Sequence, residues 1–154
     1  MQLGMVGLGR MGANIVRRLM RDGHACVVYD VSADAVATLS EEGATGSSSL
    51  DDFVAKLDKP RHAWIMVPAG EITESTVREL GARLEEGDTI IDGGNSYYRD
   101  DMRRAAELAG RGINYLDCGT SGGVFGLERG FCLMLAQPRT LPECTLAQPP
   151  SSIW

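Results

Sequence analysis

The sequence predicts an α/β protein with an open, doubly wound and mostly parallel sheet. Three observations favour this fold class: a length of 154 residues, a regular alternation of strand-like and helical segments, and a glycine-rich turn between the first strand and the first helix. The length is typical of one compact domain. The alternation is typical of βαβ units, in which each helix returns the chain to begin a new parallel strand.

The expected strands are short apolar runs, and each is followed by a segment with apolar residues at helical spacing. The strands cover 3–7, 25–30, 63–67, 89–92 and 113–118, and the helices cover 10–22, 33–42, 50–57, 72–86 and 97–111. Glycines follow four of the helices, at positions 23, 43, 87 and 112. Because glycine adopts the left-handed conformation without a steric penalty, these positions are expected to end the helices.

Two of the helices carry further local signals. In the first, Met11, Ile15 and Leu19 fall on one face, which predicts an amphipathic helix packed on the sheet. The third has a start signal, because Ser49 followed by Asp52 three residues later resembles a capping box.

The pattern divides the chain into a domain over 1–135 and a tail over 136–154. The tail contains four prolines and shows neither a helical nor a strand period. We therefore expect it to lie outside the domain's fold. A frameshift or a gene fragment is one hypothesis for its origin.

Composition and charge exclude several classes of function. The net charge of −6 and the pI near 4.9 disfavour nucleic-acid binding, which needs a concentrated basic face. A membrane span is not expected, and the start of the chain shows no secretion signal, so a cytoplasmic protein is expected. The four cysteines lack CxxC spacing, so neither a metal site nor a disulfide framework is predicted. His24 and His62 directly precede strand-like runs, which favours a surface or capping role over catalysis.

The clearest chemical motif is a GxGxxG sequence between the first strand and the first helix. It reads Gly7-Leu8-Gly9-Arg10-Met11-Gly12. Gly7 permits a tight turn, Gly9 lets the backbone approach a pyrophosphate, and Gly12 permits close packing of the helix on the strand. The amino terminus of the helix supplies free amides for the phosphates. The strand, motif and helix together predict a Rossmann-type dinucleotide-binding domain, and a purely structural glycine turn is the alternative.

Asp30 indicates which dinucleotide would bind. It ends the second strand eighteen positions after Gly12, close to the usual offset of about 20. Its carboxylate can accept hydrogen bonds from the adenosine ribose hydroxyls, whereas a 2′-phosphate would be repelled there. NAD is therefore favoured over NADP. The alternative is that Asp30 only caps the next helix together with Ser32.

Three more small-residue turns follow strands of the predicted sheet. They are Met66–Gly70, Asp92–Ser96 and Gly119–Gly123. Each could be a plain turn, but the carboxyl ends of parallel strands meet at one edge, where such sheets bind ligands. Asn95, Thr120 and Ser121 offer hydrogen bonds there without bulk. A shared site is the favoured interpretation.

These segments carry a family resemblance. Residues 7–12, 66–70, 92–96 and 121–123, in this order, resemble 6-phosphogluconate dehydrogenases over roughly 1–135. Asp92-Gly93-Gly94-Asn95-Ser96 is the most specific piece, because related 3-hydroxyisobutyrate-type dehydrogenases usually carry a serine-threonine turn there. The segment 119–130 is similar to the shorter, NAD-preferring branch of the family, and Asp30 agrees with that branch.

The resemblance implies a reaction of the pentose phosphate pathway and of gluconate metabolism. Hydride leaves C3 of 6-phosphogluconate for the nicotinamide, and the β-keto acid then loses carbon dioxide to give ribulose 5-phosphate. Carried over by residue, the motif residues Gly7, Leu8, Gly9, Arg10, Met11 and Gly12 would hold the pyrophosphate, and Asp30 the adenosine ribose. Val67 and Ala69 would line the cofactor cleft. Asn95 would contact both cofactor and sugar acid, and Ser121, Gly122 and Gly123 would receive the substrate near its carboxylate.

The resemblance also implies what this chain lacks. The family's general-base lysine and the glutamate that protonates the enediol lie beyond the matching region, and the only lysines here, Lys56 and Lys59, do not fit that motif. We therefore expect no catalytic residue in this chain. The fold is expected to be truncated before the helical second domain, which completes the substrate pocket and most of the contact within the family's homo-oligomer.

Several functions remain open from the sequence. The favoured one is a family fragment that binds dinucleotide and is inactive alone. The others are a dehydrogenase completed by another chain, a fragment of a related 3-hydroxyacid dehydrogenase, and a non-catalytic nucleotide-sensing or interaction module.

Overall fold

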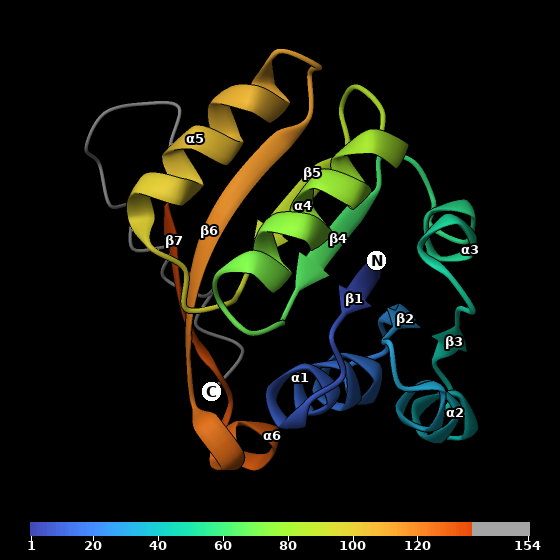
Figure 1. The fold of residues 1–154 in the computed structure, drawn as a ribbon. Coiled ribbons are helices and arrows are strands. Elements are labelled where there is room, and N and C mark those ends of the chain that lie inside the picture. The colour runs from blue at the N-terminus through green and yellow to red at the C-terminus, as the bar shows by residue number, and fades with distance from the viewer. Residues whose placement is uncertain (137–154) are drawn as a thin grey trace.

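A computed structural model describes residues 1–136 of the chain, apart from the side chain of Val124. The predicted tail over 136–154 therefore lies outside the described residues except for Ala136. In the part described, seven strands form one sheet in the order β3-β2-β1-β4-β5-β6-β7. Strands β1 to β6 are parallel and β7 is antiparallel to β6. The predicted doubly wound, mostly parallel sheet is confirmed (Figure 1).

The strands lie close to their predicted positions. They are β1 (Gln2–Val6), β2 (Ala25–Tyr29), β3 (Thr45–Gly46), β4 (His62–Ile65), β5 (Thr89–Asp92), β6 (Asn114–Ser121) and β7 (Cys132–Ala136). The helices are α1 (Arg10–Arg21), α2 (Ala33–Glu41), α3 (Leu50–Ala55), α4 (Glu71–Arg83), α5 (Tyr98–Ala109) and α6 (Gly126–Arg129), with a 3-10 turn η1 (Gly123–Phe125). None of the helices described is both long and apolar enough to cross a membrane.

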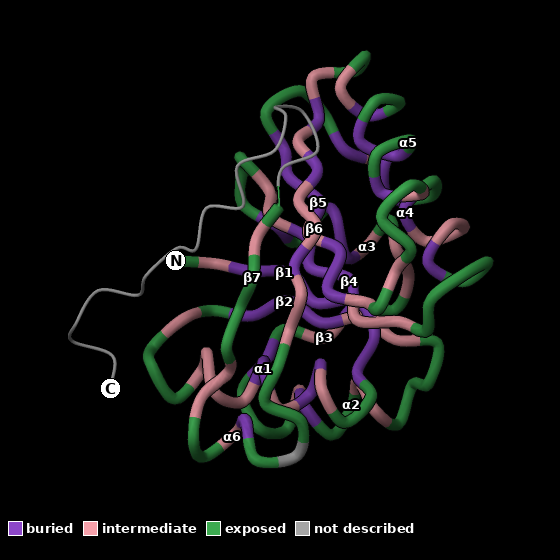
Figure 2. Tube along the Cα trace, turned by 90° about the vertical axis from the view of Figure 1, so that its left-hand side faces the viewer, coloured by how far each residue is buried: buried purple, intermediate pink, exposed green. Residues whose placement is uncertain are grey.

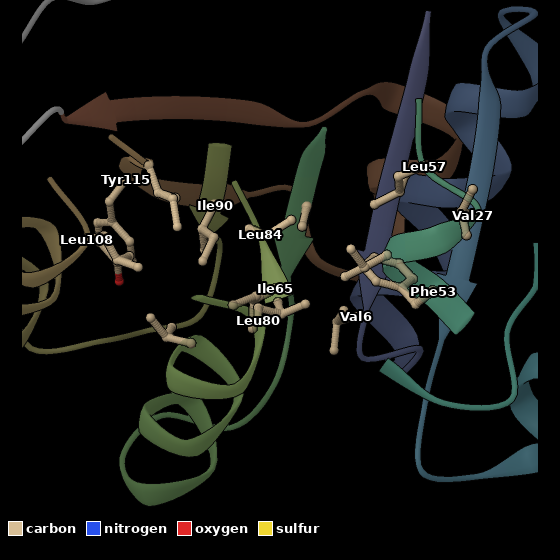
Figure 3. Packing of buried hydrophobic residues seen from close by; sticks show 14 of the residues in the cluster. Val6, Val27, Phe53, Leu57, Ile65, Leu80, Leu84, Ile90, Leu108 and Tyr115 are labelled. Atoms are coloured by element: carbon tan, nitrogen blue, oxygen red, sulfur yellow. The ribbon is translucent and has the colours of Figure 1, made fainter. Parts of the chain in front are cut away.

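Helices cover both faces of the sheet, and each face has its own apolar core. On one face, residues of α3, α4 and α5 pack on Val6, Ile65 and Ile90 (Figure 3). On the other, residues of α1 and α2 pack on Met5 and Val28. Because neighbouring residues of a strand point to opposite faces, β1 sends Met5 into one core and Val6 into the other. The central strands are therefore buried on both sides, whereas edge strand β7 is mostly exposed (Figure 2).

The predicted local signals are largely confirmed. The four glycines at 23, 43, 87 and 112 all have positive φ and lie between helix ends and the next strands. Ser49 caps α3 by accepting a hydrogen bond from the Asp52 amide at 3.1 Å. The capping box is not reciprocal, however, because the Asp52 carboxylate accepts from the amide of Ser48 at 2.9 Å.

The end of β6 differs from the prediction. Gly119–Gly123 was expected to be a turn, but Gly119, Thr120 and Ser121 continue β6 and pair with Met134, Leu133 and Cys132 of β7. Small residues favour turns only weakly, and the ladder with β7 overrides that preference. The short strand β3, the 3-10 turn η1 and helix α6 were not predicted.

Candidate functional site

The predicted ligand-binding loops lie at the carboxyl edge of the sheet, on both sides of the point where the strand order reverses. That point falls between β1 and β4, which are neighbours in the sheet but not in the sequence. Loops leaving adjacent strands toward opposite faces open a crevice there, and doubly wound proteins bind ligands in it. The loops concerned follow β1, β4 and β5.

Two glycines of the first loop are required by the protein itself. Gly7 has φ +93°, and a Cβ atom there would lie 2.8 Å from the Met66 carbonyl carbon and 2.9 Å from Val67 Cγ1. At Gly12 a Cβ atom would collide with the Gly7 carbonyl oxygen. These positions let the chain turn sharply and let α1 begin against β1 and β4.

Gly9 is different, because nothing in the protein requires a glycine there. Its φ of −60° and ψ of −177° suit any residue, and within 1–136 no atom other than those of its chain neighbours lies within 4 Å of a Cβ atom built on it. It is exposed and caps α1, a helix of twelve residues without an acidic side chain in its first turn. Within 1–136, the amides of Gly9, Arg10, Met11 and Gly12 have no acceptor. An uncovered glycine beside free amides is the arrangement that receives a phosphate.

Asp30 ties the first loop to the end of β2. Its Oδ2 accepts the Leu8 amide at 2.6 Å and its Oδ1 accepts the Ser32 amide at 2.8 Å. Ser32 in turn caps α2 by accepting the Ala35 amide at 3.4 Å. Asp30 thus contributes to the start of α2 and also fixes the glycine-rich loop. Each carboxylate oxygen keeps a second lone pair for a ribose hydroxyl.

The residues around this contact differ in exposure. Leu8 is buried in the core, so only its backbone faces the loop. Arg10 is exposed and Met11 is half-buried, so both side chains are accessible beside the free amides.

The loop after β4 is held in place by a hydrogen bond from α4. The hydroxyl of the fully buried Thr73 donates to the Pro68 carbonyl at 3.0 Å. Val67 is half-buried against the core, Ala69 is exposed, and Gly70 begins α4 with φ +96°. The exposed side of this loop is therefore small and apolar.

The loop after β5 is shaped by the carboxylate of Asp92. Asp92 Oδ1 accepts the Gly94 amide at 2.9 Å and Oδ2 accepts the Ser96 hydroxyl at 2.8 Å. A Cβ atom on Gly94 would lie 3.2 Å from the Val67 carbonyl oxygen, so this loop touches the loop after β4. Asn95, which lies between Gly94 and Ser96 in the sequence, is exposed. The three loops after β1, β4 and β5 thus form one continuous surface.

The fourth predicted segment lies farther out. In the sheet Asp92 pairs with Asp117, and β6 continues for four more residues to Ser121, about 13 Å at the usual rise per residue. Ser121, Gly122 and Gly123 are exposed. The turn and helix that follow pack on α1, where Arg18 donates to the Leu127 carbonyl at 3.1 Å. Ser121–Gly123 therefore lie beyond the level of Asp92, next to the turn and helix that pack on α1.

No histidine or lysine belongs to these loops. His24 and His62 are at the amino ends of β2 and β4. Lys56 binds the Asp52 carboxylate at 2.7 Å and the Gly46 carbonyl at 2.8 Å, and Lys59 pairs with Glu85. Among the described residues, moreover, no group of three potential metal ligands occurs.

Sequence reasoning missed a buried ionic cluster behind the loop after β5. The side chain of Arg104 is 3% exposed. Its Nη1 lies 3.4 Å from Asp92 Oδ2 and 3.1 Å from Asp101 Oδ1, and its Nε lies 2.9 Å from Glu74 Oε2. The Tyr115 hydroxyl lies 3.0 Å from Asp92 and 2.8 Å from Asp101. The available signal was that Asp101 and Arg104 occupy the same helix face as Ala105 and Leu108, where charged residues need a buried partner.

Comparison with known proteins gives one family. Residues 2–143 match the model of the NAD-binding domain of 6-phosphogluconate dehydrogenase. The NAD(+)-dependent, decarboxylating 6-phosphogluconate dehydrogenase of Haloferax volcanii is 44% identical over 139 residues, which are 90% of this chain and 46% of that protein. The chain spans about half or less of the length of the curated relatives it matches.

Solved structures agree with this match. The 6-phosphogluconate dehydrogenase of Plasmodium falciparum, studied with its cofactor NADP+ and its substrate 6-phosphogluconate, superimposes with a TM-score of 0.81 at 26% identity, over 88% of this chain and 30% of that one. The 3-hydroxyisobutyrate dehydrogenase of Mycobacterium tuberculosis gives a TM-score of 0.77 at 25% identity, over 87% and 45%.

The acidic groups behind the site differ in their proton affinity. Hydrogen bonds from Arg103, and then from Arg104, lower the pKa of Glu74 to about 2. Asp117, beside Asp92 in the sheet, has no arginine or lysine partner among residues 1–136. Burial, followed by repulsion from Asp101 and Asp92, raises the pKa of Asp117 to about 6. A raised pKa means that the folded chain binds the proton more tightly than the unfolded chain does, so this contribution to stability is present below about pH 4 and is lost as the pH rises through 6.

We predict that Asp117→Asn makes stability less dependent on pH. The variant should gain on the order of 1 kcal/mol over the parent at pH 7.5, about half of that at pH 5 and little below pH 4, since the half-buried carboxylate is partly screened by solvent. Urea unfolding between pH 3.5 and 8 measures the difference, and Asp58→Asn, at an exposed position, is the control. A gain of equal size at every pH would contradict the assignment.

Proposed function

The chain belongs to the family of the NAD-binding domain of 6-phosphogluconate dehydrogenase, and from this we propose that the crevice at the carboxyl edge binds NAD through the loops after β1, β4 and β5. One observation carries the proposal. Gly9 is a glycine that neither its backbone angles nor its protein neighbours require, and it lies at the amino end of a long helix. A bound pyrophosphate accounts for the missing side chain.

The arrangement of the loops supports a definite course for the dinucleotide. The pyrophosphate would accept hydrogen bonds from the free amides of 9–12, and Asp30, at the end of β2, would accept the adenosine ribose hydroxyls. The nicotinamide half would extend the other way, past Val67 and Ala69 toward Asn95. Strands in a sheet are about 4.8 Å apart, so the loop after β5 is about 10 Å from the loop after β1. Half of a dinucleotide can span that distance.

NAD is the proposed cofactor, in preference to NADP. The Asp30 carboxylate is fixed by two backbone amides, so it cannot swing away from a 2′-phosphate. The residues that follow, Val31 to Asp34, contain no cation that could neutralise such a phosphate. Charge repulsion and a lost pair of hydrogen bonds would both disfavour NADP.

The reaction that we propose for the whole enzyme is that of its relatives, oxidative decarboxylation of 6-phosphogluconate to ribulose 5-phosphate. Bound NAD would accept the hydride. In this chain Asn95, Ser121, Gly122 and Gly123 would contact the sugar acid. Alcohol oxidation also needs a base within hydrogen-bond reach of the hydroxyl. Both histidines lie at the amino ends of their strands, and Lys56 and Lys59 are paired with Asp52 and Glu85, so we propose that these 154 residues bind cofactor without turning substrate over.

The first prediction from the proposed function concerns Gly9. Gly9→Ala should weaken NAD binding at least about tenfold, because its methyl group occupies the space proposed for the pyrophosphate, while stability changes by less than about 1 kcal/mol. Gly12→Ala is the matched contrast, since its methyl group meets the Gly7 carbonyl and should cost about 1–3 kcal/mol of folding free energy. Titration calorimetry and urea unfolding separate the two effects. Unchanged NAD affinity in Gly9→Ala would refute the assigned pyrophosphate position.

The second prediction concerns cofactor choice. The chain should bind NAD about 5- to 150-fold more tightly than NADP, which corresponds to about 1–3 kcal/mol. Asp30→Asn should narrow that ratio, because it removes the negative charge while keeping one acceptor oxygen. Asp58→Asn, at an exposed position outside the carboxyl-edge loops, should leave the ratio unchanged. Parallel titrations with both cofactors measure it, and equal affinities in the parent would count against Asp30.

The third prediction concerns turnover. Purified chain with saturating NAD and 6-phosphogluconate should form no measurable NADH, because a positioned base typically contributes 10²- to 10⁴-fold and the loops proposed to bind cofactor and substrate carry no histidine or lysine. Absorbance at the NADH band is the measurement. Asn95→Ala controls for contaminating host enzyme, since a contaminant's rate persists in the variant. A rate that Asn95→Ala abolishes would reveal a base within the chain.

A further inference from the structure

The loop after β5 is built on a buried negative charge. Asp92 is fully buried, and four donor groups surround its carboxylate: the Gly94 amide at 2.9 Å, the Ser96 hydroxyl at 2.8 Å, Arg104 Nη1 at 3.4 Å, and at 3.0 Å the Tyr115 hydroxyl, whose single proton is shared with Asp101. Two of these donors belong to the loop and two to the framework behind it. Since a buried charge is tolerated only when it is paired and hydrogen-bonded, the loop cannot leave Asp92 without a large penalty.

The framework behind Asp92 is itself rigid. Arg104 links Asp92 of β5 to Asp101 of α5 and to Glu74 of α4. Tyr115 of β6 lies in the apolar cluster beside Leu108 (Figure 3), and its hydroxyl emerges from that cluster between Asp92 and Asp101. Four elements therefore determine where the Asp92 carboxylate lies, and the carboxylate determines the shape of 92–96.

The position of this loop suggests which part of the ligand it contacts. Gly94 touches the Val67 carbonyl, and Val67 touches Gly7, so the loop continues the surface on which the dinucleotide is proposed to lie. Asp30 is at the opposite end of that surface, on β2. The loop after β5 thus faces the nicotinamide half of the dinucleotide and not the adenosine half.

We propose that Asp92 is a positioning residue for the nicotinamide half of the cofactor, acting through the loop that it shares with Asn95 and held in place by Arg104 and Tyr115. The inference rests on the proposed binding of NAD. Asp92 itself is shielded from the ligand. Its carboxylate binds the Gly94 amide and the Ser96 hydroxyl, which lie on either side of Asn95. Because the loop is already ordered, less conformational entropy is lost when the ligand binds.

The same strand supplies a matched control at its other end. Asp88, directly before β5, is 2% exposed and accepts the amides of Arg61 and Glu85 at 2.7 and 2.9 Å. Arg61 also pairs with it at 3.0 Å. Like Asp92, Asp88 is therefore a buried aspartate that is held by an arginine and by backbone amide donors. Asp88 lies at the amino edge of the sheet, however, far from the loops at the carboxyl edge.

The test compares NAD with ADP-ribose, which has the adenosine half and both phosphates but no nicotinamide. In titration calorimetry of the 154-residue chain, Asp92→Asn should weaken NAD binding about tenfold or more and change ADP-ribose binding by less than about twofold. An asparagine turns an N–H toward at least one of the four donors, so the loop loses its fixed shape. Asp88→Asn should lower the stability of the chain without changing the ratio of the two affinities.

Tyr115→Phe keeps the Asp92 charge and removes one donor, so it should shift the same ratio in the same direction by about twofold to fivefold. Tyr115→Phe tests the proposal by itself if Asp92→Asn fails to fold. The proposal is overturned if either variant weakens the binding of NAD and of ADP-ribose equally, or if it changes neither affinity. It is also overturned if the parent binds both ligands equally well. A parent that binds neither ligand overturns the proposed function itself, which is a distinct result.

Discussion

The close approach of α1 to strands β1 and β4 is the constraint on which the rest of the site depends. Positions 7 and 12 have no room for a side chain, because the Gly7 carbonyl and the Met66 backbone occupy it. With glycine at both, the first helix begins directly at the sheet edge, and its free amides lie where β1 and β4 diverge. The crevice, the access to Gly9 and the contact of Asp30 with Leu8 all follow from that geometry.

A second constraint is electrostatic. Asp92 and Arg104 are buried, and an isolated charge in that environment would be strongly unfavourable. Satisfying Asp92 requires donors from its own loop, from α5 and from β6, so three parts of the chain far apart in sequence become interdependent. Asp88 shows the same solution with Arg61 at the amino edge. Both ends of β5 are thus fixed by an aspartate paired with an arginine, but only one end faces the proposed ligand.

The sheet also separates the proposed binding groups from the two histidines. The groups proposed to bind the dinucleotide are backbone amides, small side chains and Asp30, all at the carboxyl edge. His24 and His62 lie at the amino ends of β2 and β4. A strand of four or five residues places about 15 Å between the two edges. Within 1–136, the framework is that of a cofactor-binding half.

The sequence by itself determined the fold class, most of the strands and helices, and the glycine-rich loop with Asp30, because these depend on local periodicity and on short-range backbone geometry. Only the tertiary structure decided that Gly119–Ser121 extend β6, since that depends on pairing with β7. It alone revealed that, among the described residues, the space at a Gly9 Cβ is open, and that Arg104 and Tyr115 link Asp92 to Asp101. A sequence shows that a residue is charged, but not which distant residue will lie beside it, because that pairing is set by the packing of α5 on the sheet.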